Sequence, residues 1–281
     1  MSTLSEPSRA PVRALAGSLV PSAALKRVSL PAADDAGRSG LKADAALTLG
    51  TGFALLLLIG GGIVWAGGLD WRFLPPALLV YGVIAAFAHA GLDHHPHARF
   101  GAPNVVTTLR AVATALFAGL VLDADQIVGA PREAWAWTFA GIALVALLLD
   151  GVDGYLARRL NLQSDFGARY DMEVDALLIL LLSVLAFALG KAGAFVLAIG
   201  LMRYAFLAAQ YVLPWLSADL PHSMRRKAVC VLQAAVLGAI ITPVVEPPLS
   251  NVAALVTVSF LAWSFAVDIL WLRRNRTASP A

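Results

Sequence analysis

Charged residues are scarce in this chain. Asp, Glu, Lys and Arg make up only 14% of its 281 residues, while 59% are hydrophobic and the mean hydropathy is +0.75. Soluble domains carry about 25% charged residues, so this chain has too little charge to cover a surface that faces water. The composition excludes a soluble globule, a secreted disulfide scaffold, a disordered protein and a nucleic-acid-binding module. The single cysteine, Cys230, excludes an internal disulfide and a cysteine-based zinc site.

A sustained apolar run is absent from residues 1–43, so we predict no cleavable signal peptide there. The segment mixes Ser, Pro, Ala and Gly with six basic residues, and we interpret it as a flexible cytoplasmic tail. Two interpretations stay open for it: an untethered terminus without function, or a basic tail that rests on anionic lipid.

The rest of the chain contains apolar stretches of membrane-spanning length, given that a bilayer needs about 20 residues. Tryptophans fall near the ends of these stretches, as an interfacial belt predicts. We therefore expect an all-α integral membrane protein. The predicted helices are 45–67, 73–92, 103–122, 134–158, 171–190, 194–216, 228–245 and 250–272.

Basic residues stay on the cytoplasmic side of a membrane, and they predict an orientation here. With the N-terminus inside, cytoplasmic segments hold 16 of the 21 Lys and Arg residues and outside loops hold only Arg72, Arg132 and Lys191. Arg110 and Arg203 lie within spans. We expect an even number of spans, both termini in the cytoplasm, and a location in the cell membrane.

Acidic residues gather where the fourth predicted span ends and the fifth begins. Asp150 and Asp153 are three residues apart, and Asp171 and Asp175 are four apart, so each pair shares a helix face. Antiparallel neighbouring helices would bring all four carboxylates together at the cytoplasmic face. Four negative charges need cations to share one site, and oxygen-only ligation suits Mg²⁺ or Mn²⁺. The alternative is a structural Asp–Arg network that caps helix ends.

The same stretch carries small and basic residues at fixed gaps. It reads Asp150-x-x-Asp153-Gly154-x-x-Ala157-Arg158, then eight residues to Gly167, then Asp171 and Asp175. This spacing resembles the signature of the CDP-alcohol phosphotransferases at every defined position. The resemblance covers about residues 103–272 as a six-helix catalytic core. Three segments are not part of the resemblance: the tail at 1–43, two accessory helices with a His-containing loop at 44–102, and a basic cytoplasmic tail at 273–281.

The resemblance implies a reaction and roles for these residues. Family members transfer a substituted phosphate from a CDP-alcohol, typically CDP-diacylglycerol, to an acceptor hydroxyl and release CMP. Asp150, Asp153, Asp171 and Asp175 would surround two Mg²⁺ or Mn²⁺ ions, and Asp175 would be the general base. Four residues match positions that line the CDP pocket: Gly154, Ala157, Arg158 and Gly167. We also expect Gly167 to form the turn before the next helix. Homodimers are common in the family.

Two flanking stretches extend the resemblance. Pro103-Asn104-x-x-Thr107-x-x-Arg110 is similar to the family's opening segment, in which Asn104 and Thr107 would contact the nucleotide; an ordinary helix N-terminus is the alternative. The segment 223–233 matches a family pattern at Ser223, Lys227 and Gln233 but has Arg226 in place of Gly and Cys230 in place of Thr.

Basic residues near that second stretch favour a small polar acceptor that carries a phosphate, such as glycerol 3-phosphate or an inositol phosphate. The predicted acceptor-binding residues are Arg203, Arg225, Arg226 and Lys227. Positive-inside topology is the alternative for Arg225 and Arg226, and pairing with Asp219 or a lipid headgroup is the alternative for Arg203.

Three further interpretations stay open at this point. His94, His95 and His97 would bind a transition metal or, with better support from their spacing, form a solvated loop. A membrane transporter with the acids as an ion relay is the alternative function, although no internal repeat supports it. A third alternative is an inactive relative that acts as a scaffold, against which the intact acids argue.

Overall fold

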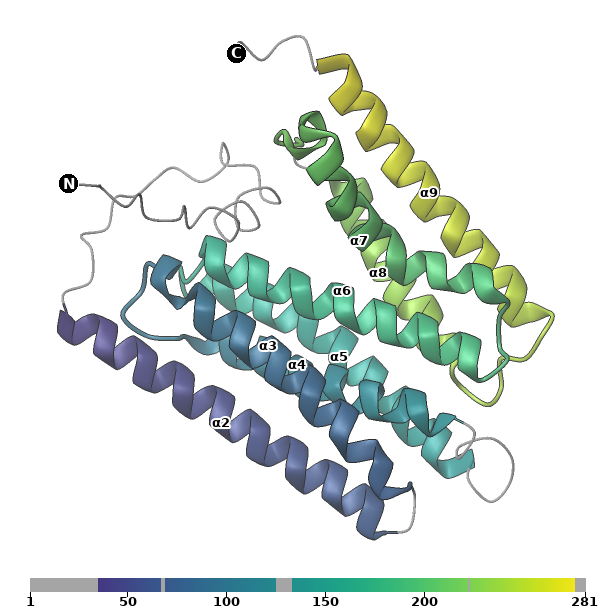
Figure 1. The fold of residues 1–281 in the computed structure, drawn as a ribbon, viewed down its shortest axis with the longest axis horizontal. Helices are drawn as coiled ribbons and strands as arrows, with labels where there is room; N and C mark the ends of the chain where they lie inside the picture. Colours follow the sequence, from purple (N-terminus) through teal and green to yellow (C-terminus); the bar gives the residue numbers. More distant parts are fainter. Residues whose placement is uncertain (1–34, 67–68, 125–132, 222, 276–281) are drawn as a thin grey trace, which may run out of the picture.

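The structure is a computed structural model that describes residues 35–66, 69–124, 133–221 and 223–275. Those residues form helices and no strand (Figure 1). The long helices are α2 (Asp35–Trp65), α3 (Leu74–Gly91), α4 (Ala102–Leu122), α5 (Glu133–Arg159), α6 (Asp165–Ala188), α7 (Leu197–Val212), α8 (Met224–Ile240) and α9 (Leu249–Asn275). Short 3-10 helices are η1 (Trp71–Phe73), η2 (Leu92–His94), η4 (Ala194–Val196) and η5 (Pro214–Ser217). The expectation of an all-α protein is confirmed.

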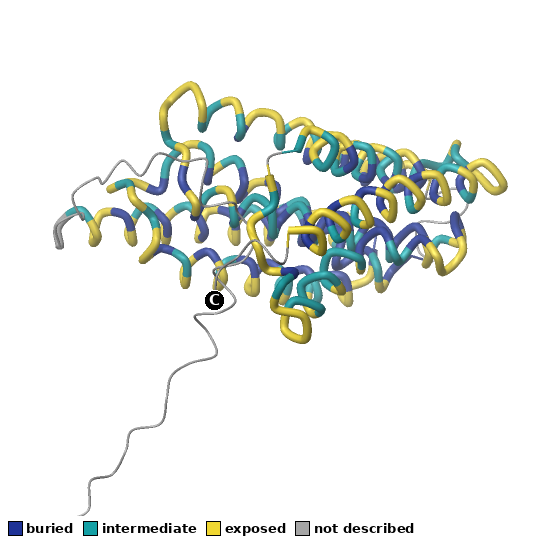
Figure 2. Tube along the Cα trace, turned by 90° about the horizontal axis from the view of Figure 1, so that it is seen from above, coloured by how far each residue is buried: buried dark blue, intermediate teal, exposed yellow. Residues whose placement is uncertain are grey.

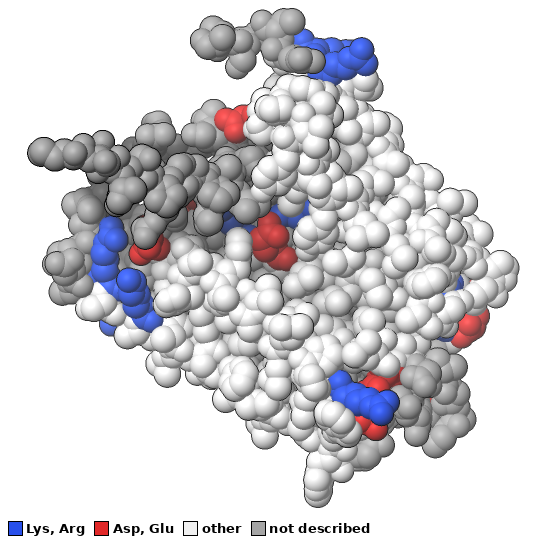
Figure 3. Space-filling view, viewed as in Figure 1, with Lys and Arg blue, Asp and Glu red and all other residues white. Residues whose placement is uncertain are grey.

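Six of these helices are long and apolar enough to cross a bilayer. α6 is not among them because its first half contains the acidic residues Asp171, Glu173 and Asp175. α8 is not among them because it has only 17 residues. Large apolar side chains such as those of Leu58, Trp65 and Val212 are exposed, and exposed residues recur along the helices in Figure 2. The face in Figure 3 is largely free of charged side chains. The chain is a multi-pass membrane protein.

α4 is the central helix of the first half. It packs against α2, α3, α5 and α6, and 67% of its most apolar stretch is buried, against 17–28% for the other five candidate spans. Small residues permit this close packing. At Gly119, for example, a Cβ atom would lie only 2.5 Å from the carbonyl oxygen of Phe73. Side chains on α4 are therefore held firmly in the protein interior.

The predicted accessory helices are present as α2 and α3, which pack on each other and on α4. The tail was predicted to run to residue 43, and this boundary was wrong, because α2 begins at Asp35. The reason is that Leu41 is buried and continues the four-residue spacing of the buried residues Ala45 and Leu49. Residues 1–34 and 276–281 lie outside the described residues.

α6 begins six residues earlier than predicted. Ser164 is its N-cap, and the Ser164 hydroxyl accepts a hydrogen bond from the backbone N–H of Gly167 at 2.9 Å, as a helix start requires. Gly167 therefore lies in the first turn of α6 and not in the preceding turn, which corrects the sequence-based expectation. Asp171 and Asp175 consequently project from a helix that is already well formed.

The last three helices form a second packing group. α7 contacts α6 and α9, and α8 contacts α9, α6 and α5. In Figure 1 α6 lies between α2 on one side and α9 on the other. The two groups meet along α6 and where α8 contacts α5, and the predicted site residues lie on both sides of α6.

Candidate functional site

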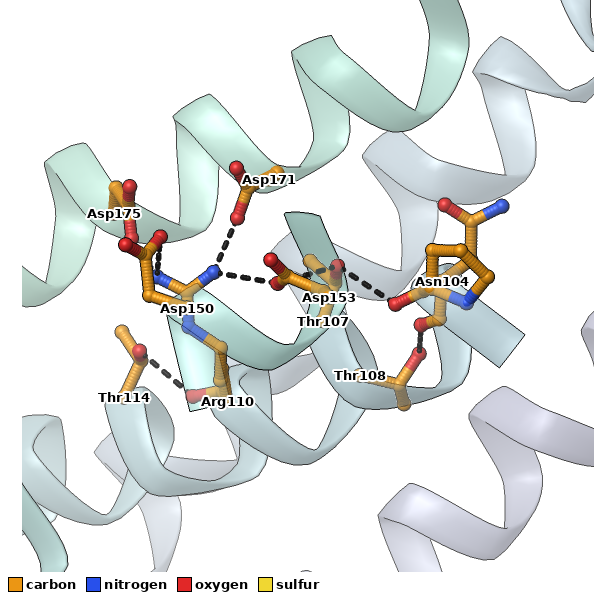
Figure 4. Close-up of polar contacts among 10 residues, drawn as sticks. Asn104, Thr107, Thr108, Arg110, Thr114, Asp150, Asp153, Asp171 and Asp175 are labelled. Carbon is orange, nitrogen blue, oxygen red and sulfur yellow. Dashed lines mark hydrogen bonds and ion pairs between the residues drawn. The ribbon is translucent and has the colours of Figure 1, made fainter. Parts of the chain in front are cut away.

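The four aspartates predicted to converge lie together on facing sides of α5 and α6 (Figure 4). Oxygen atoms of Asp150, Asp153 and Asp171 all lie within 4.8 Å of one another. Asp175 lies one helical turn beyond Asp171 and shares a contact with the same guanidinium group as the other three. The antiparallel arrangement of α5 and α6 therefore produces one acidic cluster.

Arg110 lies at the centre of this acidic cluster. Its side chain is 1% exposed, and its guanidinium group contacts Asp150 at 3.1 Å and Asp153 at 2.9 Å and also touches Asp171 and Asp175. We predicted no site role for Arg110. Two signals point to it: a basic residue in an apolar span needs acidic partners, and Arg110 lies three residues after Thr107, on the same helix face.

The residues of the acidic cluster fit divalent metal binding. Every metal-binding atom that the four aspartates offer is a carboxylate oxygen, as hard cations such as Mg²⁺ and Mn²⁺ require. As ionised groups, the four carboxylates exceed the single Arg110 cation by three negative charges. Arg110 contacts the oxygens that would bind an ion, and its buried Nε atom has no hydrogen-bond partner in the described part of the chain. An ion at these carboxylates would therefore share them with Arg110 or take its place.

The predicted CDP-binding residues of α4 and α6 adjoin the acidic cluster. The Thr107 hydroxyl lies 3.4 Å from Asp153 Oδ2, so Thr107 belongs to the edge of the cluster. Asn104 is buried, and its side-chain amide donates to the carbonyl of Phe100 at 2.5 Å. A Cβ atom at Gly167 would lie 3.0 Å from Asn104 Oδ1, so this glycine lets α6 approach Asn104 closely.

The remaining predicted CDP-binding residues follow Asp153 on α5. Gly154 and Ala157 are partly exposed, and Arg158 is exposed with its guanidinium group beside Gly154. A guanidinium group beside the residue that follows Asp153 is placed to neutralise a phosphate. The six predicted CDP-binding residues thus come from α4, α5 and α6, the three helices that carry Arg110 and the four aspartates.

A cavity of about 390 Å³ lies on the other side of α6, between α6, α7, η5, α8 and α9. Of the four aspartates, only Asp175 is among the described residues that line it. The cavity's cationic lining residues are Arg203, Arg226 and Lys227, so three of the four predicted acceptor-binding residues meet there. Arg225 does not line the cavity, since α9 engages its side chain through Ser264 and Asp268.

Acids on neighbouring helices hold the arginines of this cavity. Among the described residues, Arg203 pairs with Glu173 at 2.5 Å and not with Asp219, which was the ion-pair alternative for Arg203 in the sequence. The reason is that Glu173 lies on the α6 face turned toward α7, away from the acidic cluster. The buried Nε atom of Arg203 has no hydrogen-bond partner among the described residues, which leaves a donor for a ligand.

The histidine loop packs against the site, which corrects the expectation of a solvated loop. The His95 ring lies against Phe166, with ring centroids 5.1 Å apart, and its Nε2 atom is 3.1 Å from the Asn104 amide nitrogen. His97 reaches the carbonyl of Gln163 at 3.4 Å, while His94 is exposed. Burial, and to a smaller extent the nearby His97, lower the pKa of His95 to about 4, so this ring is neutral at physiological pH.

Comparison with known proteins agrees with this arrangement. A sequence model of the CDP-alcohol phosphatidyltransferase family matches residues 100–267. The match begins just before α4, contains all four aspartates and ends within α9. No curated protein and no solved structure gives a significant match to the chain. Because the family match covers more than half of the sequence, the chain belongs to the CDP-alcohol phosphatidyltransferase family.

Proposed function

We propose that this protein is a phospholipid-biosynthetic transferase that moves a phosphatidyl group from a CDP-alcohol, with CDP-diacylglycerol as donor, to the hydroxyl of a small polar acceptor, releasing CMP. Its family transfers a substituted phosphate group from a CDP-alcohol to a second alcohol and generally depends on divalent metals. The observation that carries the proposal is the position of Asp175. This residue belongs both to the acidic cluster and to the lining of the cavity, so it connects the two places that two substrates need.

Asp175 is the proposed general base. Its carboxylate accepts the proton of the acceptor hydroxyl while the hydroxyl oxygen forms a bond to the β-phosphorus of the donor. The bond between the β-phosphorus and the oxygen that bridges to the α-phosphorus breaks, and CMP leaves with that oxygen. The protein forms no covalent intermediate in this scheme, so its contribution is positioning and charge stabilisation.

Two Mg²⁺ or Mn²⁺ ions bound at Asp150, Asp153, Asp171 and Asp175 would supply charge neutralisation for the donor's pyrophosphate. Asn104 and Thr107 would orient the nucleotide from α4. Gly154, Ala157 and Gly167 leave room for it beside the helix backbones, and Arg158 would neutralise phosphate charge at the exposed edge. These assignments rest on the positions of the residues around the acidic cluster.

The cavity is the proposed acceptor site, and its cations favour an acceptor that carries a phosphate. Arg203, Arg226 and Lys227 line it together with Asp175. Lys227 has no ion-pair partner among the described residues, and Arg203 has the unused Nε donor noted above. Glycerol 3-phosphate and an inositol phosphate have the required chemistry: a nucleophilic hydroxyl near an anionic group.

An assay of CMP release tests the proposed function directly. The purified full-length protein in detergent or liposomes receives CDP-diacylglycerol, Mn²⁺ or Mg²⁺, and one acceptor from a panel that includes glycerol 3-phosphate, inositol phosphate, inositol, glycerol and serine. We expect CMP release that requires both the metal and one acceptor, with a lipid product whose mass identifies that acceptor. Absence of CMP release with every acceptor, in a folded sample that binds Mn²⁺, would contradict the proposal.

The same experiment separates the transferase from the alternative of a transporter. A carboxylate relay predicts ion flux into liposomes without CDP-diacylglycerol and without CMP release.

The proposal also includes a homodimer and a division into accessory helices at 44–102 and a catalytic domain at 103–272. Both termini and the acidic cluster are proposed to lie on the cytoplasmic side of the membrane. Cysteine labelling from either side of intact vesicles tests the orientation.

A further inference from the structure

Asp268 holds two arginines of α8 through one oxygen atom. Its Oδ1 atom lies 2.6 Å from an Nη atom of Arg225 and 3.1 Å from an Nη atom of Arg226. The Asp268 side chain is only 12% exposed, in the last turns of α9. A buried carboxylate at this depth is stable only when it is paired, so the three side chains form one unit.

The two arginines of this unit differ in what they face. Arg225 is turned toward α9, where its guanidinium group donates to the Ser264 hydroxyl at 2.8 Å and lies over the Trp263 ring at 5.5 Å. Arg226 lines the cavity. Because two guanidinium groups share one carboxylate, one positive charge remains uncompensated in this unit. Lys227 adds a second positive charge to the cavity wall and Asp219 adds a negative one, so cations exceed acids there by one when Asp175 is counted with the acidic cluster.

We propose that Asp268 is a positioning residue of the acceptor site. It fixes the Arg226 guanidinium group at the cavity wall, so that Arg226 and Lys227 together bind an anionic group of the acceptor. This inference depends on the proposed function for the meaning of the cavity as an acceptor site. It adds a residue outside the matched family segment, which ends at residue 267.

The positioning role and simple electrostatics predict opposite effects of Asp268→Asn on the affinity of the cavity for an anion. Removal of a negative charge from a cavity wall should strengthen the binding of an anion. If Asp268 acts by holding Arg226 in place, Asp268→Asn should weaken anion binding instead, because the guanidinium group keeps its contact with the Pro221 carbonyl but loses the charged partner that fixes its geometry at the cavity wall. A second acid of the same cavity, Asp219, supplies the matched control. It is paired with no arginine among the described residues.

Inorganic phosphate is the probe for this test, with the full-length protein in detergent. Thermal stabilisation by increasing phosphate gives its affinity for the wild-type protein, Asp268→Asn and Asp219→Asn. Cys230 is the single cysteine of the chain and lines the cavity, so protection of Cys230 from alkylation by N-ethylmaleimide, followed by mass spectrometry, locates the bound phosphate there.

We expect phosphate to bind wild-type protein and to slow the alkylation of Cys230. Asp268→Asn should bind phosphate about tenfold more weakly, as expected for loss of one charge-assisted contact, while Asp219→Asn binds it as well as wild type or better. Stabilisation by Mn²⁺ should be the same in Asp268→Asn and wild type, which a general loss of structure would not allow.

Two results would overturn the inference. Tighter phosphate binding by both variants would reduce Asp268 to a source of negative charge. Wild-type protein that neither gains stability from phosphate nor protects Cys230 would remove the anion site altogether. Phosphate binding is measured without turnover, so failure of CMP release would reject the proposed function and leave this measurement interpretable.

Discussion

The acidic cluster and the cavity wall are two polar regions of one apolar protein, and their charges are arranged in opposite ways. In the cluster, four aspartates surround the single cation of Arg110. At the cavity wall, Asp268 is shared by two arginines, and Glu173 balances Arg203. Lys227 and Asp219 also line the cavity with opposite charges. The first region has an excess of negative charge and the second an excess of positive charge, so the first suits metal ions and the second an anionic substrate.

The comparison also shows how a low-charge protein keeps such groups stable. In both regions the minority charge comes from a neighbouring helix: Arg110 from α4 for the acids of α5 and α6, and Asp268 from α9 for the arginines of α8. Burial makes an unpaired charge costly, so each region carries a partial internal counter-charge. The remaining excess is what a ligand would neutralise.

Asp175 belongs to both regions, and its replacement should have the largest effect. We expect Asp175→Asn to lower the rate of CMP release about 10²–10⁴-fold, the usual contribution of a general base, because the amide cannot accept the acceptor's proton. The rate is measured at saturating donor and metal. Asp165→Asn, on the exposed first turn of the same helix, is the control and should retain wild-type turnover. A rate for Asp175→Asn within threefold of wild type would show that another group takes the proton.

Arg110 offers the next test. Its replacement shows whether the guanidinium group neutralises the aspartates in place of metal ions or lies beside bound ions. Arg110→Met should destabilise the EDTA-treated protein by about 3–5 kcal/mol, the cost of leaving buried acids without their cation. Bound Mn²⁺ should restore much of that loss, so the stabilisation by Mn²⁺ becomes larger than in wild type. Thermal unfolding followed by circular dichroism measures both states.

Arg110→Lys is the matched control for that substitution. It keeps the positive charge but has fewer fixed donors, so its loss of stability in EDTA should be smaller. If Arg110→Met lowered stability equally with and without Mn²⁺, Arg110 would act beside the ions and not in their place.

These two regions also mark how far the sequence alone leads. Asp150, Asp153, Asp171 and Asp175 were predictable because helical spacing fixes which residues share a face, and a short connection makes the helices antiparallel. All eight helices were predictable from apolar stretches of the sequence. The buried Leu41 and the N-cap at Ser164 moved the starts of α2 and α6, and α8 spans Met224–Ile240 where 228–245 was predicted.

Contacts between distant segments were not predictable in the same way. Glu173 and Arg203 come from helices that a sequence does not orient about their axes, so their pairing depends on how α6 and α7 rotate against each other. The Asp268 unit likewise joins residues more than 40 positions apart. His95 was assigned to a loop in solvent because nothing in its local sequence shows that Phe166 covers it.

Close packing of α6 on α7 sets the position of the cavity wall, and Gly200 tests it. A Cβ atom at Gly200 would lie 2.5 Å from the Cα atom of Leu180, which forces the helices apart. We expect Gly200→Ala to lower the stability by about 1–3 kcal/mol, and to weaken phosphate binding by moving Arg203. Gly141→Ala on α5 is the control, since no atom of the described residues lies within 4 Å of its Cβ position. Equal stability of the two variants would show that α6 and α7 separate easily.

His95 provides the smallest expected effect, on the side of the acidic cluster that faces α4. Its folded-state pKa of about 4 lies below the ordinary value of 6.5, so the unfolded chain binds more protons between these two pH values. The contribution of His95 to stability is therefore present above pH 6.5, falls as the pH drops toward 4 and is constant below it. Partial exposure limits the change to about 1–2 kcal/mol. His95→Gln should flatten this part of the stability curve measured by thermal unfolding between pH 4 and 7, whereas His94→Gln, at an exposed position, should keep it. If the stability of His95→Gln fell as steeply with pH as that of wild type, the pH dependence would belong to other groups. The contact of His95 with the Asn104 amide would then contribute nothing measurable, and the Phe100 carbonyl would be the partner that holds Asn104.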